Sequence, residues 1–244
     1  MFIGEPLYRI WGYKKAYLID NDEQAAKAMY DESSKGFDYK TGQSTKGKKF
    51  AGDYEWEDRD GDGKITSQDM FCLGSSVPHS TGGLCNTFRY KNWSLRVYMD
   101  WALGHSMIDV AFKYHMMSTW NGNTVLMKEA LTAWQAPGDA ANTQWARIAA
   151  HDSNESWNYR RDSDVVTFKC DYLCLRDVSL SYNLPKSLTD RLKLGSCNVF
   201  VSGNNLHYFT AVQATPPEIS TTNDEAATGY PRLYRVTAGV NLSF

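Results

Sequence analysis

Closely spaced aspartates in the first third of the chain have the pattern of a cation-binding loop. Residues 58–69 place carboxylates at loop positions 1, 3, 5 and 12, a glycine at position 6 and an isoleucine at position 8. A hard cation such as Ca²⁺ takes roughly six to eight oxygen ligands, and this spacing wraps such oxygens around one point. The sequence therefore predicts one Ca²⁺ site. Its expected ligands are Asp58, Asp60, Asp62, the Lys64 carbonyl, Thr66 and Asp69.

The loop departs from a calcium sensor in two ways. Position 12 is Asp69, whose side chain is shorter than the usual glutamate, so a lower affinity is expected. The flanking stretches 52–57 and 70–75 read as extended chain, whereas an EF-hand has two helices. We expect a single isolated loop whose bound ion stabilises an extracellular segment. The alternative is an acidic, glycine-rich turn whose carboxylates are merely solvated.

The other reactive residue types show no catalytic or metal-binding arrangement. The cysteines and histidines are scattered, without a Cys-x-x-Cys pair or a zinc spacing, and no Gly-x-Ser-x-Gly motif occurs. We expect the cysteines to be small apolar side chains in strands. A net charge of −2 gives no support for nucleic-acid binding. The chain is therefore not expected to be an enzyme or to bind nucleic acid.

The last residues of the chain carry the clearest structural pattern. From Tyr234 to Phe244 every second residue is apolar, and the residues between are polar or small. A strand has a period of two, so all these apolar side chains fall on one face. Such a strand covers about 25 Å when tilted by roughly 40°, close to the apolar band of a transmembrane β-barrel. Taken alone, the segment fits the edge strand of a soluble sandwich equally well.

Five further segments show a strand pattern, and the connections between them favour the barrel. The six segments are about 7–19, 81–90, 93–103, 165–184, 197–208 and 234–244. Two short connections alternate with three of more than twenty residues, an asymmetry typical of outer-membrane barrels. We expect an all-β, antiparallel up-and-down meander that forms a partial transmembrane β-barrel of about six strands with long extracellular loops. Trp93 and Trp101, at the two ends of one apolar stripe, fit interfacial girdles.

The long connection 104–164 is rich in indole rings. Trp120, Trp134, Trp145 and Trp157 are suited to stacking on sugars. Ordinary packing within the loop explains these rings at least as well as contact with a ligand.

Several motifs, in order along the chain, resemble the C-terminal part of TonB-dependent outer-membrane transporters of the SusC/RagA type. The most specific is 172–185, Tyr-Leu-Cys-Leu-Arg-Asp-Val-Ser-Leu-Ser-Tyr-Asn-Leu-Pro, followed by 199–206, Val-Phe-Val-Ser-Gly-Asn-Asn-Leu. Residues 52–69 resemble the family's element around the GDG-x-I motif, and 83–95 resemble its hairpin. The resemblance covers nearly all of residues 1–244.

The resemblance implies a function that the residues alone do not give. Such a transporter is a barrel of about 22 strands plugged by an N-terminal domain. It works with a SusD-like surface lipoprotein, draws energy through TonB, and imports glycans or peptides across the outer membrane. Residues 1–244 would be the C-terminal portion of the barrel, in contact with outer-membrane lipid. The implied localisation is the cell outer membrane.

The N-terminal residues bear on how much of such a transporter the sequence holds. Residues 1–6 show no basic region followed by an apolar core, so no signal peptide is predicted. The plug domain and the TonB-contacting segment are not recognised either. We therefore expect a transporter fragment that cannot transport by itself. The alternative function is a soluble calcium-dependent carbohydrate-binding β-sandwich module; a hydrolase has only scattered carboxylates in its favour.

Overall fold

Two compact units make up the chain, and each is described separately. One comprises 1–76, 106–168 and 220–228; the other comprises 77–105, 169–219 and 229–244. The computed structural model describes residues 8–32, 34, 37–38, 43–119, 126–150, 158, 161–212, 217–218 and 233–244. None of the helices in these residues is long and apolar enough to cross a membrane.

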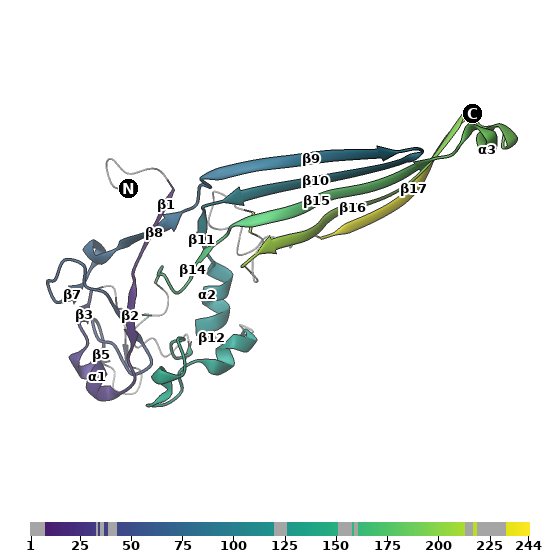
Figure 1. Ribbon diagram of the computed structural model, residues 1–244. Coiled ribbons are helices and arrows are strands. Elements are labelled where there is room, and N and C mark those ends of the chain that lie inside the picture. Colours follow the sequence, from purple (N-terminus) through teal and green to yellow (C-terminus); the bar gives the residue numbers. More distant parts are fainter. Residues whose placement is uncertain are drawn as a thin grey trace. The chain divides into compact units, whose positions relative to one another are not determined.

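Five long strands form the sheet of the second unit. They are β9 (Ser80–Tyr90), β10 (Trp93–Leu103), β15 (Tyr172–Asn183), β16 (Ser196–Thr210) and β17 (Arg235–Ser243). Figure 1 shows them side by side in the order of the sequence, and every neighbouring pair is antiparallel. The predicted all-β, antiparallel, sequence-ordered meander is therefore confirmed.

The register of this sheet sorts its side chains by polarity. Leu95 lies opposite Phe88 on one side and Leu180 on the other, and Leu180 lies opposite Val201. Cross-strand partners share a face, so these apolar residues form one surface. This face is exposed rather than covered, with Phe88 at 60 % and other strand residues at similar values. The predicted division into an apolar and a polar face is confirmed.

The short connections of the sheet lie at the same end. Residues 91–92 form the turn from β9 to β10, and Lys91 adopts the left-handed backbone (φ 51°) that so tight a turn requires. The connection from β15 to β16 contains the short helix α3 (Lys186–Arg191). The register Ser196 to Ser243 brings the end of β17 to this same end. The predicted alternation of short and long connections is therefore present.

The first expected strand is not part of this sheet. Residues 7–19 contain two short strands, β1 (Arg9–Gly12) and β2 (Lys15–Leu18). They pair with β8 (Phe71–Ser75) and β6 (Tyr54–Trp56) in the first unit. The segment alternates poorly in sequence, and its inward residues enter a core instead of lining a broad surface. Of the six expected strands, five therefore form the sheet among the described residues.

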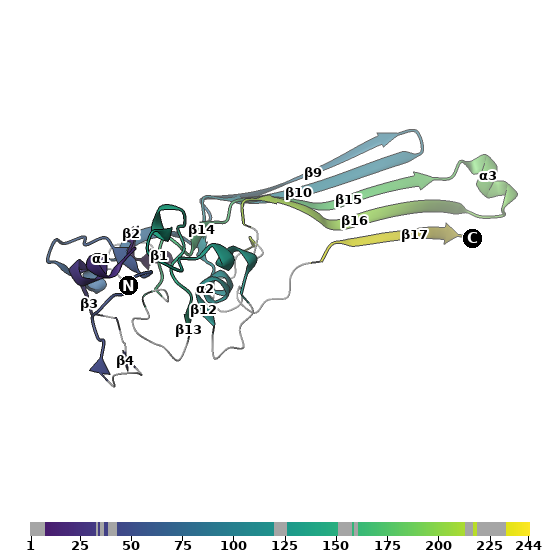
Figure 2. The ribbon, with the colours of Figure 1, turned by 90° about the horizontal axis from the view of Figure 1, so that it is seen from below.

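The long connections fold into many short elements. Besides β1, β2, β6 and β8 they contain α1 (Asp22–Lys27), β3 (Tyr30–Asp31), β4 (Phe37–Asp38), β5 (Gln43–Ser44), β7 (Lys64–Ile65), η1 (Ser67–Asp69), β11 (Ser106–Ile108), α2 (Val110–Met117), β12 (Ser118–Thr119), η3 (Lys128–Thr132), η4 (Asp139–Ala141), β13 (Ala149–Ala150) and β14 (Thr167–Lys169). Most strands here have two or three residues and pair with segments distant in sequence. Figure 2 shows these elements from a second direction. Because such strands are too short to be stable alone, their packing must come from a shared core.

Aromatic side chains form the centre of that core. The buried ring of Trp56 lies 6.0 Å from the ring of Tyr13 and 5.5 Å from that of Tyr54, measured between centroids. Trp134 and Trp145 pack against this cluster. These two indoles are therefore core residues, as ordinary loop packing predicts, whereas Trp120 and Trp157 lie outside the described residues. Tyr54 also accepts a hydrogen bond from the Ala146 amide (2.9 Å), which ties distant segments together.

Buried ion pairs accompany this aromatic core. Arg161 pairs with Asp31, and Lys49 pairs with Glu55; all four side chains are almost fully excluded from water. The guanidinium of Arg161 also lies 4.3 Å from the Tyr13 ring centroid. A charge in such surroundings stays favourable only while its partner compensates for the lost hydration. The fold of this unit therefore depends on matched charges as well as on apolar burial.

Removing one member of the buried pair should destabilise the first unit strongly. We expect Asp31→Ala to lower the free energy of unfolding of the first unit by about 3–5 kcal/mol. The substitution removes the carboxylate that pairs with the Arg161 guanidinium, which remains buried. The matched control is Asp162→Ala, which breaks the more exposed Lys113–Asp162 pair (2.9 Å) and should cost about 1 kcal/mol or less. Denaturant titration followed by tryptophan fluorescence measures both, and equal losses would contradict the role of burial.

Candidate metal centre

The acidic loop is held at both ends by strands of the first unit. β6 precedes it, β8 follows it, and β7 forms its positions 7 and 8 and pairs in parallel with β3. Ile65, at loop position 8, is fully buried in the aromatic core. The Ile65 carbonyl also accepts a hydrogen bond from the Glu32 amide (3.0 Å). One apolar side chain and one short ladder thus fix the loop, while the turn before them projects into solvent.

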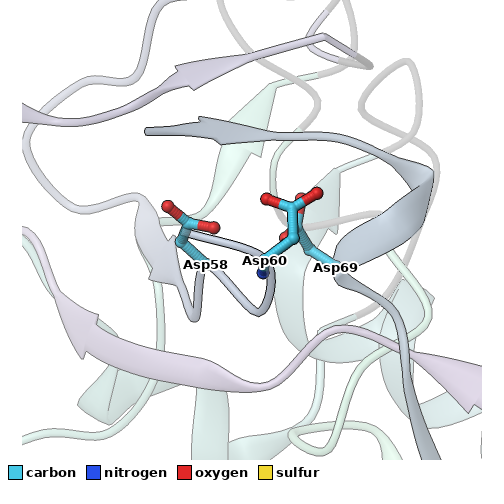
Figure 3. Close-up of side chains that lie close together, drawn as sticks. All are labelled: Asp58, Asp60 and Asp69. Carbon is cyan, nitrogen blue, oxygen red and sulfur yellow. The ribbon is translucent and has the colours of Figure 1, made fainter. Parts of the chain in front are cut away.

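Three of the predicted ligands come together. One carboxylate oxygen from each of Asp58, Asp60 and Asp69 can be chosen so that all three lie within 4.8 Å of one another. Figure 3 shows Asp60 close to Asp69, with the carboxylate of Asp58 beside them. Asp69 is fully buried, whereas Asp60 is exposed. The three carboxylates form a partly solvent-exposed set of oxygen donors, which suits a hard cation.

Backbone amides hold two of these carboxylates in place. Asp69 accepts hydrogen bonds from the amides of Arg59 (2.9 Å) and Thr66 (2.7 Å). Asp58 accepts from the amides of Gly61 (2.7 Å) and Gly63 (2.9 Å). The two glycines adopt φ of 78° and 79°, the left-handed region that lets the turn fold back on Asp58. The carboxylates at positions 1 and 12 are therefore fixed by the turn itself.

The other three predicted ligands are placed differently. Asp62 is not in the three-carboxylate group, and its Oδ1 accepts from the Lys64 amide (2.8 Å). Lys64 lies in β7 opposite Tyr30. The Thr66 hydroxyl accepts from the Gln68 amide (3.1 Å) and caps η1, forming a capping box with Asp69. The sequence spacing thus identified the loop, while the tertiary arrangement gathers three of the six expected ligands.

The electrostatics of the loop differ between its two first aspartates. Hydrogen bonds to the carboxylate, first from Gly63 and then from Gly61, lower the pKa of Asp58. Asp60 also accepts a hydrogen bond, from Asp62, which lowers its pKa. Desolvation and the negative charges of Asp62, Asp69 and Asp58 outweigh it, so the net pKa is raised. A bound cation would offset the repulsion between Asp60 and the neighbouring carboxylates.

Two charged residues, one at the acidic loop and one in the second unit, were not identified by the sequence pattern. Arg59, at loop position 2, donates to the Met70 carbonyl (2.8 Å) and lies 5.6 Å from the Phe71 ring centroid. Arg176, on the polar face of the five-stranded sheet, is the centre of a separate cluster of charged side chains. Strand periodicity alone could not indicate Arg176, because it sits at a register shift.

The five cysteines are not among the side chains gathered at the acidic loop. None of the five forms a disulfide: Cys170, Cys174 and Cys197 are buried, and Cys72 and Cys85 are exposed. Four of them lie in strands, and Cys170 lies between β14 and β15. The prediction that they are small strand side chains agrees with the placement of the four in strands.

Curated relatives match the chain along its length. TonB-dependent receptor P3 of Formosa agariphila is 26 % identical over 253 residues, which cover 99 % of this chain and 22 % of the relative. TonB-dependent receptor P26 of the same organism is 23 % identical, covering 79 % of this chain and 20 % of the relative. The chain spans about a fifth of the length of these relatives. No protein-family model matches it.

Solved structures add the fold. The RagAB peptide transporter superposes with a TM-score of 0.60 at 21 % identity, covering 97 % of this chain and 23 % of the other. The RagAB peptide importer in its closed-closed state gives a TM-score of 0.58 at 19 % identity, covering 96 % of this chain and 23 % of the other. The resemblance to the C-terminal part of SusC/RagA-type TonB-dependent receptors is confirmed. The sheet described above is therefore a segment of SusC/RagA-type architecture, and these relatives are receptors and transporters rather than enzymes.

Calcium should bind this chain at the acidic loop. Calorimetry of the full chain with Ca²⁺ should show one event at about millimolar concentration or below, lost in Asp58→Asn and in Asp60→Asn. Asp22→Asn, on α1, is the control and should leave the event unchanged. Asp62→Asn distinguishes the six ligands expected from the sequence from the three carboxylates that the structure gathers. If only Asp58, Asp60 and Asp69 bind the ion, this variant should still show the binding heat. Absence of heat in the folded wild-type chain would reduce the loop to a solvated turn.

The same binding should depend on pH. Ca²⁺ binds the ionised carboxylates, and the raised pKa of Asp60 lets protons compete at a higher pH than for an ordinary aspartate. We therefore expect the affinity to fall as the pH is lowered toward about 4. An affinity that stays constant between pH 7 and this range, measured by the same calorimetry, would contradict a role for Asp60.

Proposed function

We propose that the chain is a wall segment of an outer-membrane, TonB-dependent transporter, with the apolar face of the five-stranded sheet against lipid. The observation that carries this proposal is the exposed apolar face itself. Val236 is 64 % exposed, and most residues that share its face are apolar, among them Phe88, Leu95, Leu180 and Val201 on the other four strands. A soluble monomer rarely exposes an apolar patch of this extent, whereas a barrel wall requires one. Likeness to TonB-dependent receptors supports the same reading.

Cargo and partners form the finer part of the proposal. The parent transporter would import oligosaccharides or peptides, and the solved RagAB structures are described as a peptide transporter and importer. A SusD-like lipoprotein would cooperate at the cell surface, and TonB would supply energy through the plug domain. The first unit, built from the long connections, would then lie outside the cell. In that setting a bound Ca²⁺ would stiffen the acidic loop of an extracellular segment.

The alternative function is a soluble, calcium-dependent carbohydrate-binding β-sandwich. A sandwich buries the apolar face of one sheet against a second sheet. Here that face is exposed in the described residues. Of the four tryptophans in the connection 104–164, the structure describes Trp134 and Trp145, and both pack against a core instead of forming a platform for sugars. We therefore favour the membrane wall.

Adjacent residues on β17 test the orientation. Val240 faces the apolar side and pairs with Val199, while Asn241 faces the polar side and pairs with Asn198. In the full-length transporter, Val240→Arg should impair outer-membrane assembly by about 2–4 kcal/mol, and Asn241→Arg should cost much less. Heat-modifiable migration and surface protease protection measure assembly. Equal effects of the two substitutions would overturn the proposed orientation.

A further inference from the structure

The polar face of the five-stranded sheet carries a cluster built around an extra residue. Between two neighbouring residues of β10, strand β15 inserts one additional residue, Arg176. Such a bulge re-aims the side chain of the inserted residue. On β16 the backbone is irregular at the same level, where Asn205 adopts φ of 51°. The regular pairing of β15 with β10 and β16 is therefore interrupted at the position of the cluster.

Arg176 donates hydrogen bonds to four side chains. Its Nε and Nη2 donate to both carboxylate oxygens of Asp100 at 2.7 Å, a bidentate ion pair. Its Nη1 donates to Asn205 Oδ1 (2.9 Å) and to the Tyr208 hydroxyl (3.1 Å). Nη2 also donates to Glu218 Oε1, and the Tyr208 hydroxyl donates to that same oxygen (2.8 Å). Two donors therefore converge on one carboxylate oxygen.

Glu218 differs from the other members of the cluster. Asp100, Arg176, Asn205 and Tyr208 all lie in strands of the sheet, whereas Glu218 lies beyond the end of β16. Its side chain is 11 % exposed, so it is inserted into the cluster. The carbonyl of the preceding residue lies 3.3 Å from Nε2 of the buried His105. A carboxylate from outside the strands thus occupies a site that the strands build.

We propose that Arg176 and Tyr208 form a carboxylate-binding pair, which Glu218 occupies in the resting chain and which a carboxylate of the cargo takes over. This rests on the proposed function, in which the polar face lines the lumen. Exchange of one carboxylate for another leaves the charge of the cluster unchanged, and Asp100 still neutralises the other side of the guanidinium. Hydrogen bonds from a cation to a carboxylate are roughly twice as strong as those between neutral groups. Acidic cargo is therefore favoured over neutral cargo.

The resident carboxylate acts as an internal competitor. Glu218 is tethered to the same chain, so its local concentration is high, and only the fraction of molecules in which it has left can bind cargo here. Removing it should therefore raise the apparent affinity for a free carboxylate. The donors remain in place, because Asp100 and Asn205 still orient Arg176.

Calorimetry on the full chain in detergent tests this competition. The probes are tetraglutamate and trigalacturonate, which separate peptide from sugar carboxylates, with tetraglutamine as the neutral counterpart. Glu218→Ala should tighten binding of one or both acidic probes at least about fivefold, and Glu218→Gln should give a smaller gain. Tyr208→Phe in the Glu218→Ala background should remove most of the gain, since it deletes the donor hydroxyl and keeps the ring. Tetraglutamine should respond to none of these changes.

The matched control removes a different carboxylate from the same face. Asp177 accepts a hydrogen bond from Asn204 (2.8 Å) next to the cluster, and Asp177→Ala should tighten acidic probes far less than Glu218→Ala. An equal gain in the two variants, or no gain in Glu218→Ala, would overturn the inference. If the Val240→Arg and Asn241→Arg asymmetry holds while the gain is absent, this inference alone fails. If that asymmetry is absent, the proposed membrane orientation fails whatever the calorimetry shows.

Discussion

The hydrogen-bonded register of the five long strands is the constraint on which the second unit depends. Because side chains alternate along a strand, a slip of one residue in any pair would move that strand's apolar residues to the polar face. The pairings of β9 with β10 and of β16 with β17 run without a shift. This strict register produces an exposed apolar surface backed by a face of serine, threonine, asparagine and charged residues. A lipid-facing wall requires both that separation and an apolar face that no second sheet covers, and the face is uncovered in the described residues.

Departures from the regular register carry the chemistry of the sheet. The shifts on the two sides of β15 fall at one level, and the residue they leave over is Arg176. A bidentate pair with Asp100 satisfies most of its charge within the sheet. Its Nη1 donates to Asn205 and Tyr208, and its Nη2 also donates to Glu218, which lies outside the strands. The same physical device, an inserted residue, thus breaks the ladder and creates the one densely charged cluster described on the polar face.

The first unit solves a different problem. Its strands have two to five residues, so they cannot be stable as a sheet. An aromatic cluster around Trp56 and buried pairs such as Arg161–Asp31 take that role. Ile65 connects the acidic loop to this core, which lets a short and highly charged turn keep a defined shape. Within that shape, desolvation and the negative charges of Asp62, Asp69 and Asp58 raise the pKa of Asp60.

The sequence by itself determined the strands, their order and their faces, because a period of two needs only local information. The segments 93–103 and 234–244 were located almost to the residue, and so was the acidic loop 58–69. The strand expected at 7–19 was misplaced, since its weak alternation did not show that it would pair with β6 and β8. Only the tertiary structure decided which aspartates converge and that Glu218 reaches Arg176. Those contacts depend on how the loops fold back in space, and neither residue spacing nor periodicity in the sequence contains that information.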